Sequence, residues 1–264
     1  NWALFAANPR IRHLAIDYGR GGTLEERLAA WPRLRALVDQ PGSIVVDPDS
    51  RLTQLGLLPV CPEDSYYFFE SRAYGAGTDE SLSHLASRWA SETFDVEEPR
   101  AWIAPEDAGL SPEIALSFGV GENAEKRVRD PFEVNLLKAL VERTGSILLD
   151  KGAGGEEAAR VERAICQAGS VGVWEGDYAP FASAISRSKL YIGYDSAGQH
   201  VAAACGIPLV SVFAGSVSER MFQRWKPTGR GAIGIVRVTK DDPQEVLQRT
   251  LRAAGHLRAS QRLG

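Results

Sequence analysis

Cysteine and histidine are too scarce and too scattered in this sequence to build a disulfide framework or a metal centre. Three of the 264 residues are cysteines, and no two of them have CxxC spacing. We interpret them as reduced residues that fill apolar space, which is typical of a reducing cytoplasm. The histidines show neither HxH nor HxxxH spacing, so no metal site is predicted. These residues are Cys61, Cys166, Cys205, His13, His84, His200 and His256.

Long apolar runs are absent as well. No stretch approaches the roughly 20 apolar residues that a membrane span requires, and no signal peptide is visible. We therefore expect a cytoplasmic protein without stable membrane insertion. The chain begins at Asn1 rather than at a methionine, so we expect its natural start to lie upstream.

The sequence also lacks an excess of basic charge. It has 30 lysines and arginines against 34 aspartates and glutamates, which gives a net charge of −4 and a pI near 5.7. Proteins that bind nucleic acid by neutralising phosphates need the opposite balance. We expect no nucleic-acid partner, although a local basic pocket for one phosphorylated ligand is compatible with this charge. The hydrophobic content of 44% is ordinary for a globular protein with a real core.

What the sequence does contain is an alternation of short apolar runs and amphipathic stretches. Most of the apolar runs are continuous, which is typical of strands buried on both faces of a parallel sheet. The expected strands are Ile11–Asp17, Ser43–Asp47, Tyr66–Glu70, Glu113–Phe118, Ser146–Asp150, Val171–Trp174, Lys189–Tyr194, Pro208–Phe213 and Ala232–Val238. The expected helices are Thr23–Val38, Ser81–Phe94, Pro131–Arg143, Glu156–Ala168, Pro180–Ser186, Gly198–Cys205 and Pro243–Leu257. This order predicts a doubly wound α/β architecture.

A polar, proline-rich stretch near residues 96–112 predicts a boundary between two domains. We expect a Rossmann-like N-terminal domain at residues 1–105 and a Rossmann-like C-terminal domain at residues 106–264. About six strand–helix units follow the boundary, whereas only three strands precede it. Three strands are few for a Rossmann-like half, so the N-terminal domain is expected to be incomplete in this chain.

The first candidate ligand-binding motif, SFGVGENAEKR, begins at Ser117 and lies between a predicted strand and a predicted helix. Gly119 and Gly121 let the backbone approach a ligand closely, and exposed amides at a helix start attract phosphate. Lys126 adds positive charge suited to a diphosphate. The alternative is a glycine turn followed by a solvated basic helix start.

The same glycines also resemble a dinucleotide-binding fingerprint, because Ala124 completes a G-x-G-x-x-A spacing. That fingerprint expects an acid about 20 residues further on, at the end of the next strand. Asp150 ends the next predicted strand but comes later than this. A nicotinamide-dependent oxidoreductase therefore stays open as an alternative, weakened by the lack of a catalytic His/Lys/Tyr constellation.

The second motif, DKGAGGEE, starts at Asp150 and again joins a strand to a helix. Its glycines, Gly152 among them, clear space at the carboxyl edge of the sheet, where open α/β folds bind ligands. Glu156 or Glu157 could accept hydrogen bonds from ribose hydroxyls. The alternative is a helix whose first turn carries acids because the helix dipole favours them.

The third motif, YDSAGQHVAAACGIP, follows a buried strand. Asp195 or Ser196 can cap the helix that starts here, and its first amides would point into the crevice beside Ala197 and Gly198. His200, in the first turn, could reach the same crevice. The nucleophile elbow of serine hydrolases needs glycine two residues before the serine, and tyrosine stands there instead, so that class is excluded.

Together these segments resemble glycosyltransferase family 9, the ADP-heptose:lipopolysaccharide heptosyltransferases. The resemblance covers roughly residues 47 to 227 and is strongest in the C-terminal half. The matching segments are Asp47–Pro59, Ser117–Pro131, Gly152–Glu156, Asp195–Pro208 and Phe213–Ser216. The family implies a GT-B fold, with two Rossmann-like domains and the nucleotide-sugar held mainly by the C-terminal one. It also implies inverting transfer without metal or cofactor, in which helix amides and basic side chains stabilise the leaving diphosphate.

The resemblance implies a substrate class and a set of binding residues. The donor would be a nucleotide-diphosphate sugar such as ADP-heptose, and the acceptor a glycan or a lipid-linked glycan. A lipid-linked acceptor would bring the enzyme to the inner face of the bacterial membrane. Ser117 and Lys126 would contact phosphate, and Glu156 would hold the ribose. The diphosphate and sugar pocket would be lined by Asp195, Ser196, Ala197, Gly198 and His200.

The sequence departs from the family at several positions. Arg127–Pro131 replaces an aromatic–proline pair, Ala197-Gly198 stands where glycine and proline or leucine are usual, and the F-G-x-T turn reads Phe213–Ser216. These departures leave the donor sugar open.

The largest departure concerns catalysis. The family's base is an aspartate in a G-x-G-D loop just after the first strand, and the chain offers only Gly19–Gly22 after Asp17, in the wrong order. We therefore assign no catalytic residue. A non-catalytic nucleotide-binding GT-B module stays open as a further alternative.

Overall fold

The computed structural model describes residues 2–16, 23–48, 65–121, 123–215, 218–240 and 242–261. The chain divides into two compact units, one formed by residues 12–99 and the other by residues 1–11 together with residues 100–264. From the sequence we expected the boundary between residues 105 and 106, with the first eleven residues in the N-terminal domain. No described helix is both long enough and apolar enough to cross a membrane.

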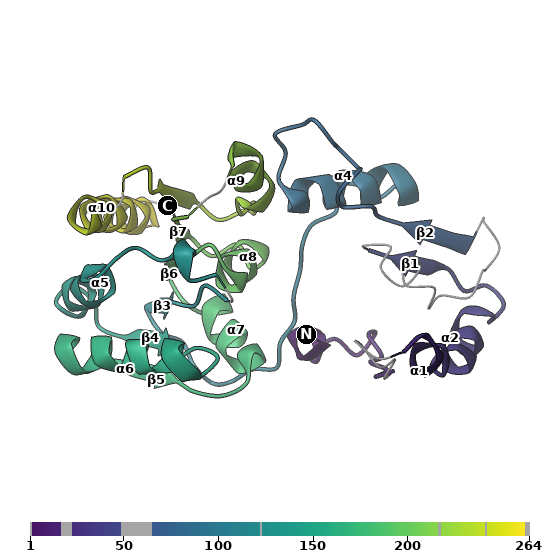
Figure 1. The fold of residues 1–264 in the computed structure, drawn as a ribbon, viewed down its shortest axis with the longest axis horizontal. Helices are drawn as coiled ribbons and strands as arrows, with labels where there is room; N and C mark the ends of the chain where they lie inside the picture. Colours follow the sequence, from purple (N-terminus) through teal and green to yellow (C-terminus); the bar gives the residue numbers. More distant parts are fainter. Residues whose placement is uncertain are drawn as a thin grey trace. The chain divides into compact units, whose positions relative to one another are not determined.

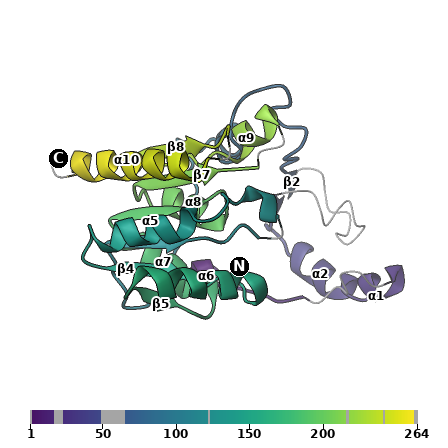
Figure 2. The same cartoon turned by 60° about the vertical axis from the view of Figure 1, so that its left-hand side comes forward.

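The C-terminal unit is built on a parallel sheet of six described strands in the order β5-β4-β3-β6-β7-β8. The chain enters at β3, winds outward through β4 to β5, and then crosses back to β6, β7 and β8 (Figures 1 and 2). This order is that of a doubly wound Rossmann sheet, whose direction reverses between its two central strands. The strands are β3 (Ile114–Ser117), β4 (Ile147–Asp150), β5 (Gly172–Trp174), β6 (Leu190–Tyr194), β7 (Leu209–Phe213) and β8 (Ile233–Arg237).

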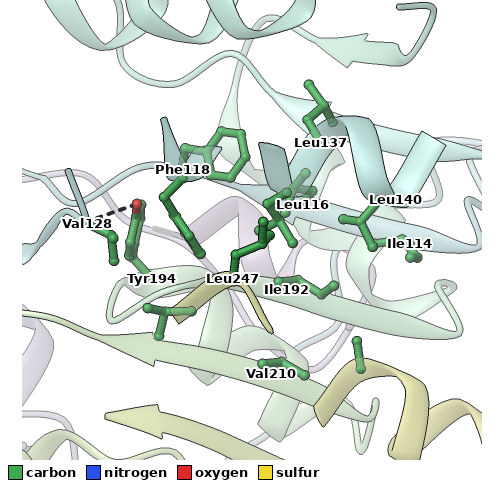
Figure 3. Close-up of a cluster of buried hydrophobic side chains, with 14 of the residues drawn as sticks. Ile114, Leu116, Phe118, Val128, Leu137, Leu140, Ile192, Tyr194, Val210 and Leu247 are labelled. Atoms are coloured by element: carbon green, nitrogen blue, oxygen red, sulfur yellow. Dashed lines mark hydrogen bonds between the residues drawn. The ribbon is translucent and has the colours of Figure 1, made fainter. Parts of the chain in front are cut away.

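Helices cover both faces of this sheet. Successive strand residues point to opposite faces, so Ile114 and Leu116 pack against α5, α6 and α10, whereas Ala115 packs against α7 and α8. Figure 3 shows part of the first core cluster, including Leu116, Ile192 and Val210. The helices are η1 (Trp2–Phe5), η3 (Ala124–Lys126), α5 (Phe132–Val141), α6 (Gly155–Ala168), α7 (Tyr178–Ser186), α8 (Ala197–Ala204), α9 (Glu219–Trp225) and α10 (Pro243–Gln261).

Burial on both faces explains why the strands of this unit could be recognised from continuous apolar runs. Each of the six lies within the range expected from the sequence. The predicted α/β class with a parallel sheet is therefore confirmed. The short helix α9 was not predicted.

The N-terminal unit pairs two short parallel strands, β1 (Val45–Asp47) and β2 (Tyr66–Phe68), with Val45 opposite Tyr66. Its described helices are α1 (Leu24–Leu28), α2 (Trp31–Val38) and α4 (Leu82–Phe94). The single helix expected at Thr23–Val38 is wrong, because Pro32 lies in the first turn of α2 and its missing N–H favours a new helix start there.

The strand expected at Ile11–Asp17 does not form over residues 11–16. Ile11 and Leu14 are 48% and 43% exposed, so this run does not bury the apolar face that a core strand needs. Asp17, the Gly19–Gly22 segment, and residues 49–59 of the N-terminal family motif lie outside the described residues.

Candidate functional site

The three sequence motifs meet at one edge of the C-terminal sheet. Ser117, the last residue of β3, pairs in register with Asp150 at the end of β4 and with Gly193 of β6. Asp195 follows β6 directly. The strands run parallel, so their carboxyl ends lie side by side at the point where the winding reverses. Open α/β sheets bind ligands in this crevice.

One side of the crevice carries a positive charge held by an aspartate. The Lys126 ammonium donates a hydrogen bond of 2.8 Å to Asp195 Oδ2. Gln199, which is fully buried, donates to Asp195 Oδ1 at 2.6 Å and accepts from Ser211 Oγ at 2.5 Å. The ammonium also donates to the Asp195 carbonyl at 3.5 Å, and the Lys126 side chain keeps 33% of its surface exposed. An ammonium has three N–H donors, so these two bonds leave one for an anion.

The start of α8 lies beside this ion pair. Ser196 occupies the N-cap position, but its side chain makes no capping hydrogen bond to described residues. The amides of Gly198 and Gln199, the second and third residues of the helix, are therefore left without the N-cap side chain that usually accepts from them. Uncapped amides at a helix N-terminus are a general binding site for phosphate.

His200 completes this side of the crevice. Its ring lies edge-on to the Trp225 ring, with centroids 6.3 Å apart, and its Nε2 lies 3.3 Å from the side-chain amide nitrogen (Nε2) of Gln199. Burial lowers the pKa of His200; Asp195 opposes this, and Lys126 adds to it. The imidazole is therefore neutral at physiological pH and can serve as a hydrogen-bond partner.

The other side of the crevice is acidic. The Glu157 carboxylate lies between Gly119 and Gly152, where it would overlap a β-carbon at Gly152 and would lie 3.1 Å from one at Gly119. It accepts a hydrogen bond of 3.3 Å from the amide of Ala153. Glu156, the residue expected to hold ribose, is its exposed neighbour in the first turn of α6. The sequence left open whether Glu156 or Glu157 would hold the ribose. In the structure the Glu157 side chain lies beside Gly119 and Gly152, whereas Glu156 is exposed.

Asp150 is a second carboxylate on this side. It accepts hydrogen bonds from Ser117 Oγ at 3.3 Å and from the amide of Gly152 at 3.2 Å. Ser117 Oγ in turn accepts from the amide of Gly119 at 3.3 Å. Burial raises the pKa of Asp150, the two hydrogen bonds oppose this, and the charge of Glu157 adds to the rise. Gly121, by contrast, is exposed, and its φ of +64° fits a glycine turn.

A buried ionic network anchors the loop that carries Lys126. Glu133 is ion-paired with Arg160, and it accepts hydrogen bonds from Arg127 Nε at 3.1 Å and from the Tyr194 hydroxyl at 3.0 Å. The Tyr194 hydroxyl accepts from the amide of Val128 at 3.3 Å, the dashed line in Figure 3. This network ties residues 127–128 to the sheet and so fixes where Lys126 emerges. The described residues hold no group of three or more acids, cysteines or histidines that could bind a metal ion.

Neither a search of protein-family models nor a search of curated proteins finds a match for this chain. Solved structures do share its fold. The glycosyltransferase family 9 protein of Veillonella parvula DSM 2008 is 15% identical, with a TM-score of 0.70 over 97% of this chain and 85% of that protein. The E. coli heptosyltransferase WaaC with ADP is 13% identical, with a TM-score of 0.61 over 90% of this chain and 78% of that one.

The same E. coli enzyme with ADP-2-deoxy-2-fluoro heptose is 15% identical, with a TM-score of 0.61 over 90% of this chain and 77% of that one. At this level of identity the likeness is one of fold. The resemblance to glycosyltransferase family 9 seen in the sequence is thus confirmed in three dimensions, over most of the chain.

Proposed function

We propose that this protein is a glycosyltransferase of family 9 with GT-B architecture. In this proposal it transfers a sugar from a nucleotide-diphosphate donor to a glycan or lipid-linked glycan, with inversion and without metal. The observation that carries the proposal is the crevice at the carboxyl ends of β3, β4 and β6. It combines uncapped amides of α8 and the Lys126 ammonium on one side with the carboxylates of Glu157 and Asp150 on the other.

The two sides of the crevice match the two halves of a nucleoside diphosphate. Ammonium and helix amides suit phosphates, whereas carboxylates suit the hydroxyls of ribose, which donate hydrogen bonds to them. We infer that the diphosphate binds at Lys126 and the first turn of α8, and that the ribose binds at Glu157. The ADP and the fluorinated ADP-heptose of the E. coli relative support a donor of this class, with ADP-heptose as the first candidate.

In the proposed reaction the acceptor oxygen attacks the anomeric carbon as the bond to the diphosphate breaks. Negative charge then grows on the leaving diphosphate. Lys126, the α8 amides and neutral His200 would stabilise that charge by hydrogen bonding from fixed positions, which lowers the barrier more than flexible water would. We assign no catalytic base among the described residues.

A nicotinamide-dependent oxidoreductase is the second candidate. The observation that favours it is Asp150, which ends the second strand of the Rossmann unit, where dinucleotide folds hold the ribose. Against it, among the described residues only the short 3-10 helix η3 follows the glycine segment, and the first α-helix begins at Phe132, well beyond Gly121. The fingerprint needs a helix that opens at the glycines and presents its amides to the pyrophosphate.

Calorimetric titration with ADP, UDP, GDP and NAD, each with and without EDTA, tests the proposal. We expect one nucleoside diphosphate to bind independently of metal. Lys126→Ala should weaken that binding by roughly 10- to 100-fold, because a charge-assisted hydrogen bond is lost. Lys138→Ala, which removes an exposed lysine from α5, is the matched control and should bind as the wild type does.

Preference for NAD would favour the oxidoreductase, and no binding of any of the four would contradict a nucleotide site here. Turnover then separates an enzyme from a non-catalytic module. We expect slow hydrolysis of the matching nucleotide-sugar, followed as release of the nucleoside diphosphate. Tight binding without any release would favour the module.

A further inference from the structure

Tyr191 carries a buried hydroxyl that the fold leaves unsatisfied. The residue lies in β6 and is fully buried against α7 and α8. No described residue completes a hydrogen bond with its hydroxyl oxygen. Such a group costs folding free energy, because its hydrogen bonds to water are lost and none replaces them. Exceptions of this kind in native proteins call for an explanation, and a functional role is a common one.

The hydroxyl lies directly beneath the first turn of α8. A β-carbon at Gly193 or at Gly198 would overlap it, so it occupies the space that these two glycines leave open. The hydroxyls of Ser196 and Ser117 are near enough to lower its pKa without completing a hydrogen bond, and burial raises that pKa more strongly. The phenol therefore stays protonated and has a proton to donate.

Tyr194 in the same strand provides a contrast. It is equally buried, on the opposite face of the sheet, but its hydroxyl both donates to Glu133 and accepts from Val128. The fold can thus satisfy a buried tyrosine in β6. The fold does not satisfy the hydroxyl of Tyr191, which lies at the start of α8, where the helix amides also lack a side-chain cap.

We propose that Tyr191 is a ligand-binding residue whose hydroxyl donates a hydrogen bond to the phosphate group bound at the first turn of α8. This inference rests on the proposed function, since its ligand is the diphosphate of the donor. A phosphate oxygen is an acceptor, and it would satisfy the phenol and the helix amides together. Ser196, one of the two serines whose hydroxyls act on the pKa of Tyr191, is partly exposed to solvent.

Tyr191→Phe removes the hydroxyl alone and is the decisive variant. Thermal unfolding of the ligand-free protein and calorimetric titration with inorganic pyrophosphate are measured together. We expect Tyr191→Phe to unfold at the same temperature as the wild type or higher, and to bind pyrophosphate roughly five- to tenfold more weakly. A loss of affinity without a loss of stability distinguishes a ligand-binding hydroxyl from a structural one.

Two matched variants sharpen the test. Tyr194→Phe deletes a satisfied hydroxyl and should lower the unfolding temperature. Tyr178→Phe deletes a second unpartnered hydroxyl, on α7, and should leave pyrophosphate binding unchanged. The inference is overturned if Tyr191→Phe destabilises as Tyr194→Phe does, if it binds pyrophosphate as the wild type does, or if Tyr178→Phe weakens binding equally.

Failure of the proposed function has a separate signature. In that case the wild type itself binds neither pyrophosphate nor any nucleoside diphosphate, and both proposals fall together. If the wild type binds and Tyr191→Phe binds equally well, only the role of Tyr191 falls.

Discussion

Two aspartates at the same sheet edge are held in opposite ways. Asp195 is ion-paired with Lys126 and accepts a hydrogen bond from the side-chain amide of Gln199, so its negative charge is compensated. Asp150 receives only neutral donors, from Ser117 and Gly152, and lies near the carboxylate of Glu157. Burial therefore raises the pKa of Asp150, and ionising it costs free energy in the folded protein.

Because Asp150 has a raised pKa, its contribution to the stability of the folded protein should depend on pH. Its pKa in the unfolded chain is about 3.9, and the folded value is higher, so the folded state holds the proton more tightly. This contribution to stability is complete below the unfolded value and is lost as the pH rises through the folded value. Asp150→Asn should therefore gain stability relative to the wild type as the pH rises above about 4, measured by urea unfolding.

Glu113 supplies a control of opposite sign. The amide of Gly145 is the main group lowering its pKa, and Arg258 and Lys189 contribute further. Stability from this carboxylate is present above the unfolded pKa and is lost as the pH falls through the folded one. Glu113→Gln should therefore lose stability relative to the wild type as the pH rises toward about 4.3, the unfolded pKa of glutamate, and this deficit should stay constant above that pH. A stability difference for Asp150→Asn that does not change with pH would contradict our account of this residue.

At the scale of elements, the start of α8 shows how one glycine shapes the site. The family resemblance has proline or leucine where Gly198 stands, and any β-carbon here would overlap the Tyr191 ring and hydroxyl. Gly198 thus lets the tyrosine lie beneath the helix. The departure from the family pattern has a packing reason that the sequence alone did not reveal.

Helical glycines in α8 and α10 should respond to alanine in opposite directions. Gly198→Ala forces the new methyl group against Tyr191 and should destabilise the protein by about 1–3 kcal/mol. Gly255 in α10 has open space around its missing β-carbon, so Gly255→Ala should stabilise by about 0.5–1 kcal/mol through helix propensity. Chemical denaturation of both variants checks this. Equal effects would mean that Tyr191 does not occupy the space beside Gly198.

The elements that could be predicted from the sequence were those whose pattern reports burial directly. The strands of the C-terminal sheet are continuous apolar runs because helices cover both faces. Helix α9 was not predicted from the sequence, because its seven residues are too few to show a periodic apolar pattern. The strand expected at Ile11–Asp17 was wrong because a local apolar run does not specify a pairing partner.

The candidate site was predictable in outline and not in detail. Glycines and polar residues after buried strands indicated the correct sheet edge, since parallel strands bring their carboxyl ends together. Adjacent acids in a helix point about 100° apart, so only the fold shows that Glu157 approaches Gly119 and Gly152. The sequence did not indicate a ligand-binding role for Tyr191, which it showed only as a residue of a predicted strand. Whether its hydroxyl has a hydrogen-bond partner depends on which residues the fold places around it.

At the scale of the whole molecule, the two units bury their strands very differently. In the C-terminal unit, β3, β6 and β7 are flanked by strands on both sides and are buried at every position. In the described part of the N-terminal unit, β1 and β2 pair only with each other, and Val46 and Phe68 are 46% and 52% exposed. A two-stranded sheet with exposed apolar side chains is marginal by itself.

This contrast predicts how backbone amides exchange with deuterium in the ligand-free protein. Amides of β3, β6 and β7 should exchange slowest, because they open only when the whole C-terminal unit unfolds. Amides of the edge strand β5, which is largely exposed, should exchange faster, and those of β1 and β2 fastest. Mass spectrometry of peptides covering these strands measures the order. Slow exchange in β1 and β2, equal to that of β6, would show that the N-terminal unit unfolds only together with the C-terminal sheet, and our view of two separately stabilised units would be wrong.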